Sequence, residues 1–534
     1  MLRLIRTYAD FLNRKSYSFY FIVFLFLLVP ALLINIGAMP LIADEPTRAL
    51  VSLEMILRKN YIVPTINGDP YYNKPPLYNW IVAALYNIFG SQKEWVIRIP
   101  TLLGLFIYSL IIYFFVKKKI GKREAMLTVA LYVASGRILF YDSFLGLIDT
   151  LFSAFIFLNF MIIHNYFSKG KYWQMFFLSY FITAVCFMLK GLPAIVFQGI
   201  TLVVMLVYEK KINLVWSLQH VCAIVFFFLL LSCYYIPYSY HNGIDTLFKT
   251  LISESTKRTV AEKGVVESLW HLITFPFEFI FHFLPSTLLV IFLINSETIR
   301  TIKEHNFLAY CSLIFLANFL VYWLSPETVP RYLFMFLPLF YMVCLHFYDK
   351  DVQNKDSKLY NTFRRFLVVV SFMLSFSMLI PLFIQLPITN GEKIFYSLML
   401  FLCSLTASVS QMVAKRHTLM LFLISLLIAR IAMNVFIFPW RIHNDPDQTF
   451  KDAALRVAEI TKGQPLYLDE YAPVNHAQSF YITRERQEVL YKERGEWKSG
   501  VFYITMRTPD STCRLYYTFK SNWNNVDLYL VKKL

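Results

Sequence analysis

The chain has 534 residues, of which 57% are hydrophobic and 16% are charged. A soluble protein of this size carries about 25% charged residues, so the composition excludes an ordinary soluble enzyme and favours a polytopic membrane protein. The net charge of +17 raises nucleic-acid binding as an alternative. We expect no nucleic-acid partner, because most basic residues lie in short loops between apolar segments, as the positive-inside bias requires.

Thirteen apolar segments are long enough to be read as membrane spans. The first is longer than the core of a signal peptide and no small-residue cleavage pattern follows it, so we interpret it as a signal anchor. The predicted spans cover residues 17–39, 95–116, 124–141, 145–167, 172–189, 192–208, 214–237, 270–294, 306–324, 330–348, 364–386, 393–413 and 418–438.

Charge alternates between the loops. The N-terminal arm is basic, and so is every second loop, as in Lys117-Lys118-Lys119, Arg364-Arg365 and Lys415-Arg416. Basic loops stay in the cytoplasm, so we place these there and the alternate loops outside. Two outer loops are unusually long, at residues 40–94 and 238–269. Thirteen spans also put the C-terminus outside.

Composition divides the chain after Pro439-Trp440. Residues 1–440 hold all the predicted spans, whereas residues 441–534 are polar and contain none. Within this second part, helical spacing covers Phe450–Thr461. The predicted strands are Pro465–Leu468, Gly500–Met506 and Val526–Val531. We therefore expect a small soluble α/β domain with a modest core.

The first outer loop contains two stretches with helical character. Residues 46–59 are amphipathic and predict a helix on the membrane surface. Residues 75–89 are mostly apolar, but about 15 residues are too few to cross a bilayer comfortably, so we expect an interfacial or re-entrant helix. The seven cysteines of the chain include no Cys-x-x-Cys pair, which argues against a disulfide framework or a cysteine metal site.

The same loop carries the most informative motifs of the chain. Ala43-Asp44-Glu45-Pro46 follows directly on the first span, and Tyr71-Tyr72-Asn73-Lys74-Pro75-Pro76-Leu77 ends it about thirty residues later. Ionisable groups at the edge of a bilayer are costly to desolvate and usually mark a functional site. The structural alternative is that Asp44 only caps a helix whose first residues include Pro46.

This order of motifs resembles the first external loop of bacterial GT-C glycosyltransferases. It is most similar to the family of the lipid A aminoarabinose transferases and their dolichyl-phosphate-mannose-protein mannosyltransferase relatives, and the similarity covers the first 340 residues. It implies an inverting hexosyl- or pentosyltransferase of the bacterial inner membrane with its site facing the periplasm. The donor would be a polyprenyl-phosphate sugar such as one on undecaprenyl phosphate. The acceptor would be lipid A or another glycolipid, with a protein hydroxyl as the alternative.

The resemblance also implies roles for three carboxylates. Asp44 matches the presumed catalytic base, which would take the proton of the acceptor hydroxyl. Glu45 is the second acid of the pair and is free to cap or to bind. Asp149, in Leu147-Ile148-Asp149-Thr150, matches a second acidic position, and Asp142 in the same short loop competes with it.

Cationic and hydroxyl side chains would hold the phosphate of the donor. Lys74 is the first candidate, and Arg258 and Tyr332 match further phosphate-binding positions of the family. Arg331 adjoins Tyr332, and Arg48 stands one residue beyond a family arginine. Arg98 and Lys190 also match patterns of the family, and we interpret them as structural pairs or helix-end anchors.

No cofactor is expected. Some relatives bind a metal through a glutamate before the lysine, but Asn73 stands there, so the sequence supports no divalent metal site. Membrane lipids are the remaining partners. A rival class, a non-enzymatic lipid or polysaccharide transporter, would show internal repeats and broken helices at the midplane. The sequence shows neither, and its polar residues gather at one face.

Overall fold

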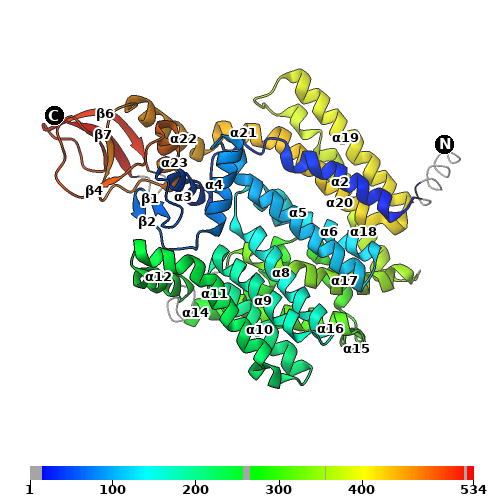
Figure 1. Cartoon of the computed structure of the whole chain (residues 1–534). Helices are drawn as coiled ribbons and strands as arrows, with labels where there is room; N and C mark the ends of the chain where they lie inside the picture. Colours follow the sequence, from blue (N-terminus) through cyan, green and yellow to red (C-terminus); the bar gives the residue numbers. More distant parts are fainter. Residues whose placement is uncertain (1–11, 13–14, 257–264, 327, 355, 522–525) are drawn as a thin grey trace.

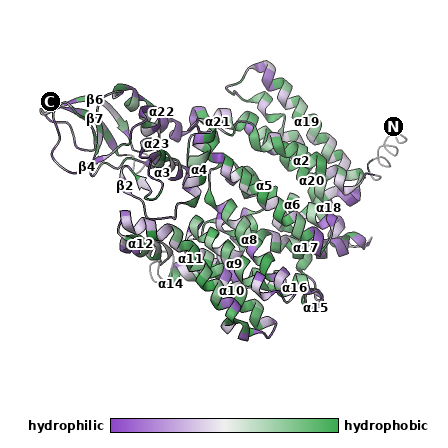
Figure 2. Ribbon diagram, in the orientation of Figure 1, coloured by the Kyte–Doolittle hydropathy of each residue, from purple (hydrophilic) through white to green (hydrophobic). Residues whose placement is uncertain are grey.

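The computed structural model describes residues 12, 15–256, 265–326, 328–354, 356–521 and 526–534. Figure 1 shows a large bundle of helices with a small sheet domain at one end, next to the elements of the first outer loop. In Figure 2 the bundle is mostly hydrophobic, whereas hydrophilic residues gather in the C-terminal domain and at helix ends. A polytopic helical membrane protein, as predicted, has this distribution.

Among the described residues, nine helices are long and apolar enough to cross a membrane. They are α5 (Glu94–Lys119), α8 (Ile148–Phe167), α9 (Tyr172–Lys190), α11 (Leu218–His241), α16 (Asn306–Trp323), η4 with α17 (Pro330–Phe336, Leu337–Gln353), α18 with η5 (Lys358–Ser377, Ile380–Phe383), α19 (Asn390–Val413), and η6 with α20, η7 and α21 (Lys415–His417, Thr418–Ala432, Met433–Ile437, Phe438–Asn444).

Two bent pairs raise this number to eleven. One joins α6 (Lys122–Val133) to α7 and η1 (Gly136–Phe140, Asp142–Phe144) at 51°, and the other joins α14 (Val265–His282) to η3 (Ser286–Leu293) at 120°. The two other predicted spans coincide with α2 (Tyr17–Leu33) and α10 (Pro193–Tyr208), which have 17 and 16 residues. The count of thirteen therefore exceeds the nine to eleven helices of spanning length in the described chain, because α2 ends soon after Pro30 and α10 begins only at Pro193.

Shorter helices join the spans. They are η2 (Ile212–Trp216), α12 (Ile244–Thr256) and α15 (Thr298–Glu304). The first outer loop contains α3 (Glu45–Leu57), the hairpin of β1 (Thr65–Ile66) and β2 (Asp69–Pro70), and α4 (Leu77–Phe89). At 13 residues α4 is too short to span, as expected of an interfacial helix.

Helix α3 forms where the amphipathic pattern predicts it, but its charged residues do not all face outward. Glu54 is fully buried because the β1–β2 hairpin folds over it. Its carboxylate accepts hydrogen bonds from the Thr65 hydroxyl at 2.6 Å and from the backbone N–H groups of Asn67 and Gly68 at 2.6 and 3.2 Å. Burial still raises the pKa of Glu54. The sequence pattern predicted a solvent-facing Glu54, but its carboxylate instead holds the β1–β2 hairpin in place.

The C-terminal domain is a sheet covered by two helices. Its strands follow the order β4-β3-β5-β7-β6, with β3 parallel to β4 and β5, and β7 antiparallel to β5 and β6. A helix and three strands lie where the sequence predicts them, whereas α23, β4 and β6 were not predicted. The elements are α22 (Pro446–Ile460), β3 (Leu466–Asp469), α23 (His476–Arg486), β4 (Lys492–Glu493), β5 (Phe502–Thr505), β6 (Cys513–Lys520) and β7 (Asp527–Lys533).

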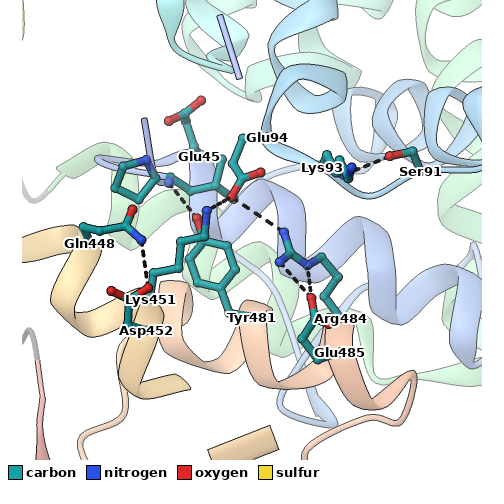
Figure 3. Close-up of polar contacts among 12 residues, drawn as sticks. Glu45, Ser91, Lys93, Glu94, Gln448, Lys451, Asp452, Tyr481, Arg484 and Glu485 are labelled. Carbon is teal, nitrogen blue, oxygen red and sulfur yellow. Dashed lines mark hydrogen bonds and ion pairs between the residues drawn. The ribbon is translucent and has the colours of Figure 1, made fainter. Parts of the chain in front are cut away.

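One contact between this domain and the bundle is made by its helices. Glu94, in the first turn of α5, lies 2.6 Å from Lys451 Nζ of α22 and 3.6 Å from Arg484 Nη1 of α23 (Figure 3). The backbone N–H of Leu41, just before α3, donates to the Tyr481 hydroxyl at 2.9 Å. These contacts fix the helices of the domain against the entrance of the first outer loop.

The β1–β2 hairpin makes a second contact with the same domain. Asp69 lies 2.8 Å from Arg494 and 3.1 Å from Lys492. Gly68 has a φ of +79°, and a Cβ atom there would lie 2.3 Å from the ring of Tyr491. Only glycine fits this turn without moving the tyrosine or straining the backbone.

Candidate active site

Asp44 stands at the N-terminal end of α3, but its side chain makes no capping hydrogen bond. The Asp44 carboxylate lies instead 2.5 Å from Nη2 of Arg331. Arg331 belongs to η4, 287 positions further along the chain. The side chain of Asp44 is 58% exposed. Its carboxylate is therefore both held by a cation and open to a second reactant, which the capping interpretation did not foresee.

Glu45 has the opposite environment. It is fully buried, and Arg98 forms two contacts with it, at 2.9 Å from Nε and 3.2 Å from Nη2. The backbone N–H of Gly146 also donates to it at 2.7 Å. Arg98 in turn donates to the carbonyl of Pro40 at 3.0 Å. This network ties the start of α3 to α5 and to the loop before α8.

Asp149 lies in the first turn of α8 and is held by two cations. Lys190 Nζ, at the end of α9, is 2.5 Å from Oδ1, and Nε of Arg331 is 3.1 Å from Oδ2. Lys190 Nζ also lies 3.7 Å from the centre of the Tyr332 ring. Arg331 thus joins Asp149 to Asp44, and four distant segments of the chain converge on one point.

These residues surround a narrow cavity at the edge of the bundle. Its free volume of about 30 Å³ is close to that of a single water. Charged side chains fill most of the space, so a larger anion enters only if one of them moves. The lining residues are Asp44, Arg48, Lys74, Gly146, Leu147, Ile148, Asp149, Lys190 and Tyr332.

The charge of the site is unbalanced. Two carboxylates face four cations, an excess of two positive charges. The carboxylates are those of Asp44 and Asp149, and the cations are those of Arg48, Lys74, Lys190 and Arg331. No cluster of three or more His, Cys, Asp or Glu side chains suited to a metal occurs in the described part of the chain. The arrangement suits an anion together with a carboxylate base.

Most predicted site residues meet here. Asp142 is buried, pairs with Nε of Arg137 at 2.9 Å and is not among the cavity's lining residues, whereas its competitor Asp149 is. Arg48 is buried with its guanidinium 5.4 Å from the centre of the Tyr71 ring. Arg258 lies outside the described residues.

Lys190 is the cavity residue that the sequence reasoning undervalued. It was interpreted as part of a structural pair or as a helix-end anchor; it does form an ion pair, the shortest contact of Asp149, but this pair lies in the wall of the cavity. The signal was present in Lys190-Gly191-Leu192-Pro193, where a glycine at φ +84° ends α9 and α10 begins at once.

A histidine of the C-terminal domain supports this region from outside. His476, at the start of α23, has Nδ1 2.8 Å from the Thr47 hydroxyl in the first turn of α3. Burial, together with the positive charges of Arg48 and Lys492, lowers the pKa of His476. The neutral imidazole is therefore the form that this interface accommodates.

Comparison with known proteins places this geometry in a class. Residues 73–236 match the model of a family described as dolichyl-phosphate-mannose-protein mannosyltransferase. The chain superimposes on the crystal structure of ArnT from Cupriavidus metallidurans bound to undecaprenyl phosphate, with a TM-score of 0.66 and 15% identity, covering 97% of this chain and 98% of that one. The apo state of the same protein gives a TM-score of 0.61 at 14% identity. The fold is thus that of the ArnT structures.

Two curated relatives are similar over shorter lengths. One, from Aquifex aeolicus (strain VF5), carries only the description "uncharacterized protein" and is 25% identical over 243 residues, 45% of this chain and 48% of its own. The other is the undecaprenyl phosphate-alpha-4-amino-4-deoxy-L-arabinose arabinosyl transferase of Photorhabdus laumondii, 25% identical over 214 residues, 39% of this chain and 37% of its own. The chain thus spans half or less of the relatives that it matches.

Proposed function

We propose that the protein is a membrane glycosyltransferase that moves a sugar from a polyprenyl-phosphate donor to an acceptor at the membrane surface. The observation that carries this proposal is the cavity itself, where an exposed carboxylate borders a site with two excess positive charges. The mannosyltransferase family segment and the names of two similar proteins, which mention undecaprenyl phosphate, support the same donor class.

The cations would hold the phosphate of the donor. Lys74, Lys190 and Tyr332 all line the cavity beside Asp149. The donor phosphodiester carries one negative charge, and the polyprenyl phosphate that leaves carries up to two. An excess of positive charge therefore stabilises the leaving group more than the substrate, which is the condition for faster reaction.

Asp44 would act as the base. In this mechanism the acceptor hydroxyl gives its proton to Asp44 while its oxygen attacks the anomeric carbon of the donor. The bond from that carbon to the phosphate oxygen breaks, its electron pair stays with the phosphate, and the configuration inverts. Arg331 holds Asp44 at 2.5 Å, so an incoming phosphate that attracts Arg331 would also release the base.

We further propose that the site faces the periplasm of a bacterial inner membrane, with the C-terminal domain on the same side. Lipid A or another glycolipid is the favoured acceptor, because Asp44 lies at the edge of the bundle. A protein hydroxyl is the second candidate, and the family model over residues 73–236 favours it.

Two measurements test the proposal. Mass spectra of the lipid A and envelope proteins from cells with and without the gene should differ by one sugar in one of the two fractions. Purified protein should bind undecaprenyl phosphate, and Lys190→Ala should weaken binding about 10- to 100-fold, as expected for a charged hydrogen bond. Lys350→Ala, in a lysine that contacts Thr301 far from the cavity, is the matched control. Equal spectra together with equal binding would refute the proposal.

A further inference from the structure

The sheet of the C-terminal domain has a second face, opposite the one that packs on the helices. Tyr467, Tyr503 and Val531 are paired across β3, β5 and β7, so their side chains share this face. Leu468, Ile504 and Leu530 share the buried face. Residues of the segments 493–497 and 507–513 lie over the first face and line an open cavity of about 500 Å³. This is the size of a small-molecule site.

The wall of this cavity combines a carboxylate, a guanidinium and an aromatic ring. Asp469, at the end of β3, is buried and accepts a hydrogen bond from the Thr505 hydroxyl at 2.7 Å. Nε of Arg507 lies 3.2 Å from the same carboxylate. The Trp497 ring stacks on Tyr503 with 4.6 Å between the ring centres and 6° between the planes, and Arg507 lies 5.9 Å from its centre. Asp469 and Trp497 are therefore held in place before any ligand arrives, whereas the Arg507 side chain is 62% exposed.

A carboxylate, a guanidinium and a flat ring side by side match the surface of a sugar. Neighbouring hydroxyl groups can donate to the carboxylate and accept from the guanidinium, because a hydroxyl does both. The apolar C–H face of the ring can then lie on the aromatic surface. A lipid tail would find little here, since most of the lining is charged or polar.

The charge of the cavity narrows the kind of sugar. Five acidic and three basic residues line it, an excess of two negative charges. The acids are Asp469, Glu470, Glu493, Glu496 and Asp510, and the bases are Arg494, Arg507 and Lys533. A phosphorylated ligand would meet like charge, whereas a neutral or amino-substituted sugar would not.

One ion pair connects this cavity to the candidate active site. Arg494 lines the cavity and lies 3.8 Å from Glu470, and it also lies 2.8 Å from Asp69 of the β1–β2 hairpin. The chain runs from Asp69 directly to Lys74 in the active-site cavity. Arg494 therefore ties this cavity to the hairpin from which the chain leads to Lys74.

We propose that the C-terminal cavity binds a neutral or amino-substituted sugar, and that this sugar belongs to the acceptor. Only the second clause rests on the proposed glycosyltransferase function. The cavity would hold the acceptor by its glycan on the outer side of the domain, while the reacting hydroxyl is presented to Asp44.

Saturation-transfer NMR on the full-length protein tests the binding directly. The protein is kept in a zwitterionic amine-oxide detergent, because a maltoside would compete. The probes are glucosamine, N-acetylglucosamine and glucose 6-phosphate. We expect a saturation-transfer signal for glucosamine and N-acetylglucosamine. The signal for glucose 6-phosphate should be at least about tenfold weaker, because its phosphate meets the negative charge of the cavity. A preference for glucose 6-phosphate, or binding of a lysine-rich peptide with no sugar binding, would overturn the proposal.

Variants assign the signal to this cavity. Trp497→Ala should reduce the saturation-transfer signal of glucosamine and N-acetylglucosamine about tenfold, as expected for loss of an aromatic hot spot. Trp497→Phe, which keeps a ring, should restore most of it. Glu496→Gln should weaken glucosamine more than N-acetylglucosamine, since it removes one negative charge. Trp216→Ala, in a tryptophan that is 85% exposed elsewhere, is the matched control.

The outcomes separate this inference from the proposed function. Melting temperatures show whether Trp497→Ala has unfolded the domain, and in that case Trp497→Phe and Glu496→Gln decide. Unchanged signals in the folded variants would place sugar binding elsewhere and refute the inference. Because the assay needs neither donor nor turnover, sugar binding without any transfer activity would instead contradict the glycosyltransferase proposal.

Discussion

The cavity at Asp44 and the cavity at Trp497 differ in size and in the sign of their net charge. The one at Asp44 has about 30 Å³ of free space and an excess of positive charge, whereas the one at Trp497 has about 500 Å³ and an excess of negative charge. In the cavity at Asp44, the carboxylates and the cations pair with one another, so an anion that enters must compete for the cations. In the second, the charged groups stand around an open space. The difference indicates that phosphate and sugar are recognised at separate places, joined through Asp69.

The sharpest test of the first cavity is Asp44→Asn, which keeps the size of the side chain but removes its basicity. Loss of a general base lowers rate by about 10²–10⁴. Sugar transfer by purified protein measures it, while binding of glucosamine at the second cavity should stay unchanged. Asp452→Asn, in an exposed aspartate of α22, is the control. Near wild-type transfer in Asp44→Asn would remove it from the role of base.

Glu45→Gln should act on stability more than on chemistry. It leaves Arg98 buried without its partner, and breaking one side of a buried ion pair costs about 3–5 kcal/mol. Thermal unfolding in detergent should show a clear fall in melting temperature. Glu459→Gln breaks an exposed pair with Arg456 and should change stability by less than about 1 kcal/mol. A stable Glu45→Gln that has lost transfer would instead make Glu45 catalytic.

Lys74→Ala should weaken donor binding and leave the fold intact, because Lys74 lies between helices rather than within one. A cation–phosphate contact of about 1.5–3 kcal/mol corresponds to a roughly 10- to 100-fold loss. The measurement is binding of undecaprenyl phosphate, with Lys93→Ala, an exposed lysine of the same loop, as the control. If Lys74→Ala altered sugar binding at the second cavity and not phosphate binding, the division between the cavities would be wrong.

Asp69→Asn tests the connection between the cavities. Its pairs with Lys492 and Arg494 are partly exposed, and such pairs contribute about 0–1 kcal/mol. We expect a change of less than about fivefold in transfer, measured at limiting acceptor, and none in donor binding. Glu488→Gln, in an exposed glutamate that pairs with Arg486, is the matched control. If Asp69→Asn weakened donor binding at saturating acceptor, the hairpin would act on the cavity at Asp44 alone.

The smallest effect concerns pH. The folded protein lowers the pKa of His476, so the fold favours the neutral imidazole. Stability is then fully present above the ordinary histidine pKa of about 6.5 and falls as pH drops below it. The melting temperature of the wild type should fall between about pH 7 and pH 5, and His476→Gln should reduce that slope. An equal slope in both proteins would contradict this assignment.

Much of the fold could be predicted from the sequence because hydropathy acts locally. Each of the thirteen apolar segments overlaps a helix, and α4 was separated from them by its length. The failures came where tertiary contacts decide. Glu54 looks like a surface charge until the β1–β2 hairpin covers it, and β6 has little alternation, with several consecutive exposed residues.

The candidate site was accessible from the sequence only in part. Asp44, Lys74, Asp149 and Tyr332 were expected from motifs, and the structure gathers them around one cavity. How Arg331 joins the two carboxylates could not be foreseen, because that contact spans 287 positions of the chain. The second cavity gave no sequence signal at all, since its residues come from strand ends and turns that share no spacing.

The turn at Gly68 has a consequence for modular exchange. The ring of Tyr491 occupies the place where any side chain at that position would begin. The hairpin and the C-terminal domain are therefore shaped to each other although more than four hundred residues separate them in the sequence. A chimera that receives the C-terminal domain of a relative should assemble only if the hairpin is transplanted with it, so the unit that evolution or an engineer can swap is discontinuous.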